Sequence, residues 1–124
     1  MILLVTGARS GFGKLAAIEA AQRGHTVYAS LRDLDTAGPL REAAAGLDVI
    51  PVQLDVTRSE ERQAVVAQIM KSHGRIDGLV NNAGVALGGF LEEIDEDELR
   101  KQFEVNVFGL WALTRLVLPT MRDQ

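Results

Sequence analysis

The chain of 124 residues contains no cysteine, which excludes disulfide bonds, thiolate metal sites and thiol chemistry. Basic residues are not in excess, because 13 Lys and Arg face 17 Asp and Glu and the formal net charge is -4. Nucleic acid is therefore not an expected partner. Every apolar run is too short to cross a membrane, and the opening run is too short for a signal peptide and follows no basic leader. We therefore expect a cytoplasmic protein without membrane contact.

The residues that are present favour one folded domain. Apolar residues make up 47% of the chain and charged residues 24%, as in ordinary globular proteins. No low-complexity tract, strict repeat or internal boundary divides the sequence. We therefore treat residues 1–124 as a single domain.

Four short apolar runs predict β-strands, and helical segments separate them. The runs are residues 2–5, 26–30, 49–54 and 76–80. Thr57-x-x-Glu60 has the pattern of a capping box before the helix that follows the third run. The alternation predicts the α/β class, with a parallel sheet, helices on both faces and right-handed crossovers.

The first predicted strand runs directly into a glycine-rich segment, Thr6-Gly7-Ala8-Arg9-Ser10-Gly11-Phe12-Gly13. Gly7 suits the tight turn after the strand, Gly11 lets the backbone approach a ligand, and Gly13 lets the next helix pack closely. That helix would point its free N–H groups and positive dipole end at the turn. The segment therefore predicts a pyrophosphate site, although its Gly-x-x-x-Gly-x-Gly spacing differs from the general dinucleotide fingerprint.

A second candidate segment, Asn81-Asn82-Ala83-Gly84, ends the fourth predicted strand. In a parallel sheet it would lie at the carboxyl edge beside the glycine turn, where ligands bind if the strand order reverses. The two asparagine amides can hold neighbouring strands or a ribose, and the small residues leave room for a cofactor. An ordinary turn is the alternative, since Asn and Gly are common in turns.

A long helix is predicted from about residue 95 to 118, with Asp95-x-x-Glu98 as its N-terminal cap. Asn106 interrupts its apolar stripe. An unpaired amide on a core-facing stripe costs roughly 1 to 3 kcal/mol, so Asn106 should have a backbone, water or ligand partner. The alternative is a structural asparagine that bends the helix, a role that is compatible with a catalytic one.

Taken together, these motifs resemble the N-terminal half of the short-chain dehydrogenase/reductase family. They follow its order and approximate spacing over essentially the whole chain: Thr6-Gly7-x-x-x-Gly11-x-Gly13, Asp55-Val56, Asn81-Asn82-Ala83-Gly84 and Asn106-Val107-x-Gly109. The resemblance implies a Rossmann-like, doubly wound parallel sheet that binds NAD or NADP. It also implies an oxidoreductase that interconverts small-molecule alcohols and carbonyls by hydride transfer.

The resemblance assigns a role to each matching position. Ser10 and Phe12 would line the diphosphate and ribose, Asp55 would bond the adenine amino group, and Val56 would pack on adenine. Asn106 is the catalytic candidate, because it would help to hold the water of the proton relay. For Asp55 the alternative is a cap before the next helix. The predicted cofactor-binding residues are Gly7, Arg9, Ser10, Gly11, Phe12, Gly13, Arg32, Asp55, Val56, Asn82, Ala83 and Gly84.

The end of the second predicted strand favours NADP over NAD. Leu31 stands where we expect the family's NAD-selecting acid, and Arg32 follows it, as in NADP-preferring members. Arg9 adds a second cation, and each charge-assisted bond to the 2′-phosphate would contribute roughly 1.5 to 3 kcal/mol. Two alternatives stay open. Asp33 would reach the ribose after a small alignment shift, and Arg32 would otherwise be a solvated surface residue.

The family's catalytic Tyr-x-x-x-Lys pair and its preceding serine are not among the 124 residues. Tyr28 is the only tyrosine and has Arg32, not lysine, four residues later, so we interpret it as a packing residue. His25 and His73 each adjoin a helix-ending glycine and are interpreted as solvated turn residues. We therefore expect a chain that is truncated relative to the family and inactive alone. Nucleotide binding without turnover is the alternative function.

The long predicted helix is also the basis for expecting a homo-oligomer. Family members commonly dimerise through helices in this region, and Trp111 and Leu118 are the candidate contact residues. Burial of both side chains against the chain's own sheet is the alternative. The family's substrate loop lies outside the 124 residues, so the sequence leaves the identity of the substrate open.

Overall fold

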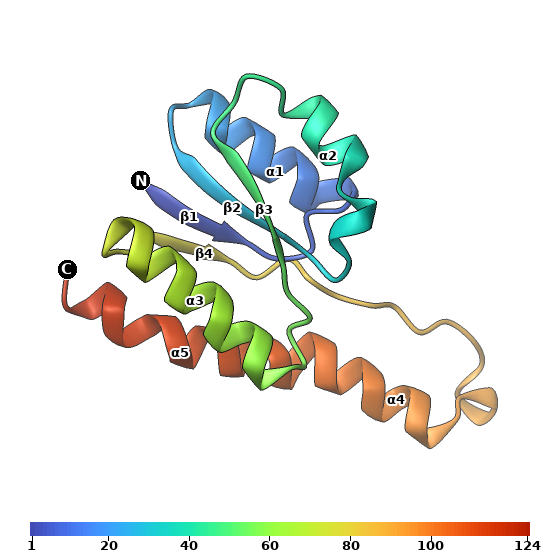
Figure 1. Cartoon of the computed structure of the whole chain (residues 1–124). Helices are drawn as coiled ribbons and strands as arrows, with labels where there is room; N and C mark the ends of the chain where they lie inside the picture. Colours follow the sequence, from blue (N-terminus) through green and yellow to red (C-terminus); the bar gives the residue numbers. More distant parts are fainter.

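The computed structural model describes Met1 to Gln124 and contains one parallel sheet (Figure 1). The predicted α/β class is confirmed, and the strands pair in the order β3-β2-β1-β4. Because the chain crosses from β1 towards β3 on one side and then returns to β4 on the other, the strand order reverses between β1 and β4. The strands are β1 (Ile2–Val5), β2 (Thr26–Leu31), β3 (Val49–Gln53) and β4 (Gly78–Val80).

Helices cover both faces of the sheet, as predicted (Figure 1). Two of them, α1 (Gly11–Gln22) and α2 (Gly38–Ala43), lie on one face, and α3 (Ser59–His73) and α5 (Leu110–Arg122) lie on the other. The remaining elements are the 3₁₀ turns η1 (Leu34–Thr36) and η2 (Leu91–Glu93), the helix α4 (Glu96–Phe103) and the π-helical segment η3 (Glu104–Gly109).

Each face of the sheet has its own apolar core, because neighbouring strand residues point to opposite sides. Leu4 and Tyr28 belong to the core under α3 and α5, whereas Val5 and Val27 belong to the core under α1 and α2. All four side chains are at most 2% exposed. Burial on both faces explains why the strands read as continuous apolar runs, and Tyr28 is a packing residue as predicted.

The prediction for His73 needs correction. Its ring is exposed, but Nε2 lies 3.0 Å from the hydroxyl oxygen of Tyr28. The two rings also meet edge to face, with their centroids 5.7 Å apart. This contact gives the hydroxyl of a buried tyrosine its polar partner. His73 therefore ties the end of α3 to β2 instead of serving only as a turn residue.

The capping box predicted at Thr57 and Glu60 is wrong. α3 begins at Ser59, and no side chain caps its first turn. The neighbouring Glu61 reaches back instead, and its Oε2 accepts a hydrogen bond from the backbone N–H of Asp55 at 2.6 Å. The Glu61 carboxylate therefore ties the backbone at Asp55, just after β3, to the first part of α3.

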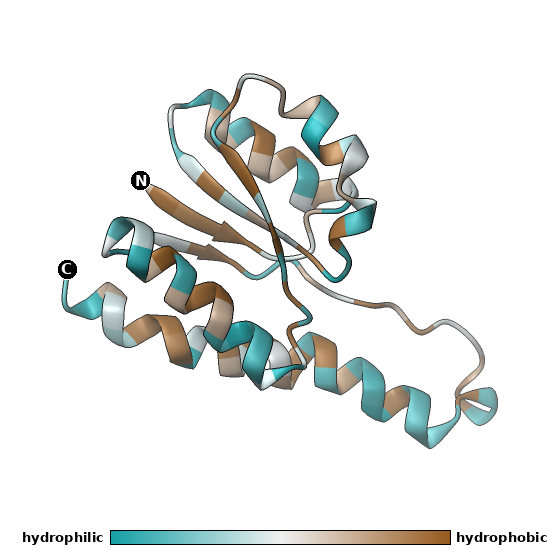
Figure 2. Cartoon of the chain, in the orientation of Figure 1, coloured by the Kyte–Doolittle hydropathy of each residue, from teal (hydrophilic) through white to brown (hydrophobic).

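The predicted long helix begins at Glu96 and ends at Arg122, but its middle is the π-helical segment η3. The first part, α4, has no buried residue, projects beyond the sheet and is mainly hydrophilic (Figures 1 and 2). Asp95 caps it, because its Oδ1 accepts a hydrogen bond from the N–H of Asp97 at 2.8 Å. None of the helices combines the length and apolar character that a membrane crossing requires.

Candidate functional site

Glycine shapes the turn that joins β1 to α1. Gly7 has a φ of 68°, and a Cβ atom there would lie 2.8 Å from the Cα of Ala83. Gly13 is buried, and a Cβ atom there would lie 2.9 Å from the carbonyl carbon of Gly7. Gly11 has a φ of 57° and open space around it. Gly7 and Gly13 thus allow the tight turn and the close helix packing, whereas Gly11 has open space around it.

The first turn of α1 has no capping partner. Ser10 occupies the position before the helix, but no side chain accepts a hydrogen bond from the first N–H groups, and no acidic residue lies in the first turn. These N–H groups and the positive end of the helix dipole suit an anion. The start of α1 therefore has the chemistry of a phosphate site.

Asn82 fastens this turn to the end of β4. Its Nδ2 donates hydrogen bonds to the carbonyl oxygens of Thr6 at 3.0 Å and Gly7 at 3.1 Å. In return, Thr6 Oγ1 accepts hydrogen bonds from the backbone N–H groups of Asn82 at 3.0 Å and Ala83 at 2.9 Å. Of the two roles left open for the asparagines, the amide of Asn82 holds neighbouring strands. Asn81 reaches α5, where its Nδ2 donates to Thr114 Oγ1 at 2.8 Å.

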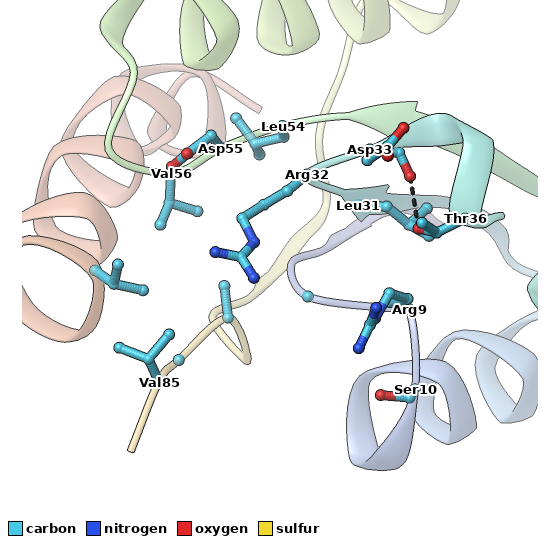
Figure 3. A pocket seen from close by; sticks show the side chains of 14 residues that line it. Arg9, Ser10, Leu31, Arg32, Asp33, Thr36, Leu54, Asp55, Val56 and Val85 are labelled. Atoms are coloured by element: carbon cyan, nitrogen blue, oxygen red, sulfur yellow. Dashed lines mark hydrogen bonds between the residues drawn. The ribbon is translucent and has the colours of Figure 1, made fainter. Parts of the chain in front are cut away.

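A pocket of about 560 Å³ lies beside the glycine-rich turn and the ends of the strands (Figure 3). Most of the predicted cofactor-binding residues line it: Gly7, Arg9, Ser10, Arg32, Asp55, Val56, Ala83 and Gly84. Gly11, Gly13 and Asn82 do not line it, and neither does Phe12, whose side chain is 86% exposed. Four further residues, which were not predicted from the sequence, also line the pocket: Thr36, Leu54, Val85 and Val105.

Asp55 holds the turn beside the pocket. Its Oδ1 accepts hydrogen bonds from the backbone N–H of Thr57 at 2.9 Å and from Thr57 Oγ1 at 2.7 Å. Partial burial raises the pKa of the Asp55 carboxyl, but these two bonds and the cationic Arg32 and Arg58 outweigh it, so the pKa lies below its ordinary value. The alternative for Asp55 was a cap before the next helix, but Oδ1 binds Thr57 in the turn before α3 and no side chain caps the helix itself. The carboxylate stays ionised beside the pocket.

This lowered pKa predicts a loss of stability in acid. The ionised Asp55 carboxylate favours the folded state above the unfolded-state pKa, and that contribution disappears as the pH falls through the lower folded-state pKa. The free energy of unfolding should therefore decline below about pH 4, as measured by urea denaturation at a series of pH values. Asp55→Asn should make this decline shallower, and an equally steep decline in the variant would contradict the assignment.

Asp33 closes the turn after β2. Its Oδ1 accepts a hydrogen bond from the N–H of Asp35 at 2.9 Å, and its carbonyl oxygen accepts one from Thr36 Oγ1 at 2.7 Å. Asp33 lines the pocket, but one of its carboxylate oxygens serves as the cap of η1. The guanidinium of Arg32 forms no hydrogen bond or ion pair within the chain. Its side chain extends into the pocket (Figure 3).

The side-chain amide of Asn106 has a backbone hydrogen-bonding partner, which is one of the partners predicted from the sequence. Its Oδ1 accepts a hydrogen bond from the backbone N–H of Val85 at 2.8 Å, and its Nδ2 donates to the carbonyl oxygen of Val85 at 2.7 Å. Within the same π-helical segment, Gly109 packs so closely that a Cβ atom there would lie 2.8 Å from Val56 Cγ2. Asn106 does not itself line the pocket, but it fixes Val85, which does.

Replacing Asn106 should loosen that pocket wall. Asn106→Leu removes both hydrogen bonds to Val85 and should lower the free energy of unfolding by about 2 kcal/mol in urea denaturation. Asn106→Asp keeps the acceptor for the Val85 N–H, and its loss should be smaller at a pH where the new carboxyl is protonated, because its O–H can then donate to the Val85 carbonyl oxygen, which an ionised carboxylate would repel. The assignment fails if Asn106→Leu is as stable as the original protein.

The chain matches the model of the short chain dehydrogenase family over residues 1–124, and it belongs to that family. It is 44% identical over 127 residues to the uncharacterized oxidoreductase YusZ of Bacillus subtilis, with 98% of this chain and 44% of that protein covered. It is 39% identical over 122 residues to the 3-ketodihydrosphingosine reductase of Bacteroides thetaiotaomicron, with 98% of this chain and 42% of that protein covered. The chain thus spans less than half the length of these two relatives.

The fold is also similar to that of solved family members. One is a metagenomic short-chain oxidoreductase in complex with NADP, with a TM-score of 0.90 and 32% sequence identity. That match covers 99% of this chain and 57% of the other. The doubly wound, Rossmann-like architecture expected from the motifs is therefore confirmed, and the chain's relatives are oxidoreductases.

Proposed function

We propose that the chain is the cofactor-binding part of an NADP-dependent oxidoreductase, which interconverts a small-molecule alcohol and its carbonyl. The observation that carries the proposal is a single pocket that joins the uncapped start of α1 to two arginines. Ser10 lines the pocket where α1 begins, and Arg9 and Arg32 supply cations on its wall. A dinucleotide with an extra phosphate offers a diphosphate to the start of α1 and a 2′-phosphate to the two arginines.

The residues present suit such a cofactor. The cradle around Gly7 has no space for a side chain, because Ala83 lies against it, and it would hold the diphosphate at the start of α1. Asp55 and Val56 would contact the adenine base, and Ala83 and Gly84 would line the middle of the cofactor. When bound, the cofactor would supply or accept the hydride.

In the proposed site, Asn106 acts through Val85 and positions the wall beside the reacting end of the cofactor. The proton relay water expected from the family resemblance belongs to the same proposal. We therefore expect Asn106→Leu to weaken cofactor binding as well as to lower the free energy of unfolding.

NADP is the proposed cofactor in preference to NAD. A carboxylate that selects NAD must bond the ribose diol, and one oxygen of the Asp33 carboxylate is already engaged with the N–H of Asp35, which leaves only the second oxygen for the diol. Arg32 and Arg9 both reach the pocket and would bond the 2′-phosphate (Figure 3). The NADP complex of a structurally similar family member supports this choice.

Nucleotide binding without turnover is the second candidate function. Reduction of a carbonyl needs an acid for the developing alkoxide, and Tyr28, the only tyrosine, is 2% exposed and lies in the core under α3 and α5. The experiment is to measure NADPH binding and NADPH oxidation with a panel of ketones and aldehydes. Binding with oxidation supports the oxidoreductase, binding without oxidation supports the second function, and the lack of binding contradicts both.

A homo-oligomer through the α4–α5 face is part of the proposal. Trp111 is 59% exposed and Leu118 is 46% exposed, so neither is buried against the chain's own sheet. One hollow on this helical run carries Glu96, Arg100 and Glu104, of which Glu96 and Arg100 pair with each other, and a second carries Arg115 and Arg122. Antiparallel pairing of two copies would set Glu104 of one copy towards the basic hollow of the other.

Sedimentation measurements test this pairing. Trp111→Glu should yield monomers, whereas Phe90→Glu, a change at another exposed aromatic residue, should leave the assembly intact. A monomeric original protein would contradict the pairing. The cytoplasmic location expected from the sequence stays a prediction.

A further inference from the structure

We infer that Glu61 and Arg62, at the start of α3, are positioning residues that hold the pocket wall at Asp55 and Val56 where it receives the adenine base. The inference rests on the proposed function and extends it to two side chains outside the pocket. Asp55 and Val56 line the pocket, whereas Glu61 and Arg62 do not. The two positioning residues therefore act on the base only through the backbone of the wall.

The two side chains bind neighbouring residues of the wall from the same helix. Glu61 Oε2 accepts a hydrogen bond from the backbone N–H of Asp55 at 2.6 Å, and Arg62 Nη1 donates one to the carbonyl oxygen of Val56 at 2.5 Å. Both bonds are partly buried and each involves a charged side chain, which makes them stronger than bonds between neutral, solvated groups. Two bonded points restrict both the position and the orientation of the wall relative to α3.

The wall depends on these bonds because no strand pairing includes it. β3 ends at Gln53, where its pairing with β2 also ends, and α3 begins only at Ser59. On another side the wall meets η3, where a Cβ atom at Gly109 would lie 3.0 Å from the carbonyl oxygen of Val56. The Val56 carbonyl is therefore restrained by the Arg62 guanidinium as well as by the close approach of η3.

The start of α3 gives up local helix stabilisation for these contacts. Glu61 is the third residue of the helix, from which a glutamate in a capping box reaches back to the residue just before the first turn. Its carboxylate instead binds farther back, at Asp55, and no side chain caps the first turn. Arg62 follows it near the positive end of the helix dipole, where a cation is unfavourable. Departures of this kind from local preference are expected at functional positions.

A fixed wall matters because the contact with adenine is directional. In the proposed complex the Asp55 carboxylate bonds the amino group of the base, and the Val56 side chain packs on its ring. A hydrogen bond weakens steeply when its partners are misaligned, and a wall that is already ordered loses little freedom on binding. Removal of either bond from α3 lets the wall move and weakens the contact with the base. The phosphate contacts, at the start of α1 and at the arginines, stay in place.

The relative affinity for NADPH and for its hypoxanthine analogue tests this inference, because the analogue carries an oxygen in place of the adenine amino group. In calorimetric titrations the original protein should bind NADPH about tenfold more tightly than the analogue. Arg62→Met keeps an extended side chain without the guanidinium, and Glu61→Leu removes the carboxylate. Each should reduce the affinity ratio to about two. A change in the folded fraction affects both ligands equally, so a loss of stability alone leaves the ratio unchanged.

Glu61→Gln and Glu60→Leu are the matched controls, and both should keep the ratio of the original protein. The glutamine retains an oxygen that accepts the hydrogen bond from Asp55. Glu60 lies in the same turn of α3, and its exposed side chain forms no hydrogen bond or ion pair, so its loss removes the same charge without touching the wall.

An unchanged ratio in Arg62→Met or in Glu61→Leu overturns the inference and leaves the proposed function intact. Equal binding of NADPH and the analogue by the original protein also overturns it, because the wall then does not recognise the base. Failure of the original protein to bind NADPH overturns the proposed function itself.

Discussion

Gly13→Ala is expected to lower the free energy of unfolding by about 3 kcal/mol and to remove nucleotide binding. The added methyl group would collide with Asn82 Nδ2 and with the backbone of Gly7, so the turn, the amide or the helix must shift. Each of these shifts disturbs the hydrogen bonds from Asn82 to Thr6 and Gly7. Urea denaturation measures the stability, and calorimetric titration with NADPH measures the binding.

Gly38→Ala is the matched control for this substitution. Gly38 also lies at the start of a helix, but its φ is ordinary and a Cβ atom there would meet nothing within 4 Å apart from its chain neighbours Ala37 and Pro39. Its replacement should change stability by less than about 1 kcal/mol and leave binding unaltered. If Gly13→Ala proves as harmless as Gly38→Ala, the close approach of α1 to the turn is not what shapes the site.

Arg32→Asp is expected to reverse the choice of cofactor. NADPH loses a charge-assisted bond and gains a repulsive neighbour, which should weaken it by more than about a hundredfold. The new carboxylate can instead accept hydrogen bonds from the ribose diol of NADH. The ratio of the two dissociation constants should therefore shift by about a thousandfold in favour of NADH.

Arg23→Asp provides the same change of charge outside the pocket. Arg23 pairs with Glu19 at the end of α1, and its side chain is 71% exposed. Its distance from the pocket lining and screening by salt should leave the ratio nearly unchanged. An equal shift in both variants would mean that net charge, and not a contact at the end of β2, determines cofactor choice.

Much of the fold was predictable because local patterns and burial agree. The continuous apolar runs at β1 and β2 belong to strands buried on both faces, and the glycines of the first turn sit where their conformations or contacts require them. The amide of Asn106 was expected to have a partner because an unpaired one is costly in a helix that packs on a core. These features follow from residue type and short-range spacing.

The remaining features depend on contacts between segments far apart in the chain. Nothing in the sequence around Tyr28 indicates that His73 bonds its hydroxyl, since the two residues lie 45 positions apart. The π-helical segment η3 likewise combines the bonds of Asn106 to Val85 with the close packing of Gly109 on Val56. A helical pattern alone cannot separate such a segment from an ordinary α-helix.

Among the residues of the pocket, some have a local signal in the sequence and others depend on contacts between distant segments. Thr36 lines the pocket because Asp33 folds the chain back into η1, and its one local signal is the Asp-x-x-Thr spacing of that turn. Val105 lines it only because η3 lies against Val56. Thr36 could therefore be predicted from the turn pattern, whereas Val105 could be placed only once the packing of distant segments was known.

We propose that the pocket at the ends of the four strands binds NADP through the start of α1 and the two arginines. Calorimetric titration of the purified chain with NADPH and with NADH, at one fixed salt concentration, tests it most directly. We expect NADPH to bind at least about tenfold more tightly than NADH. Equal affinity for the two cofactors, tighter binding of NADH, or no binding of either would contradict it.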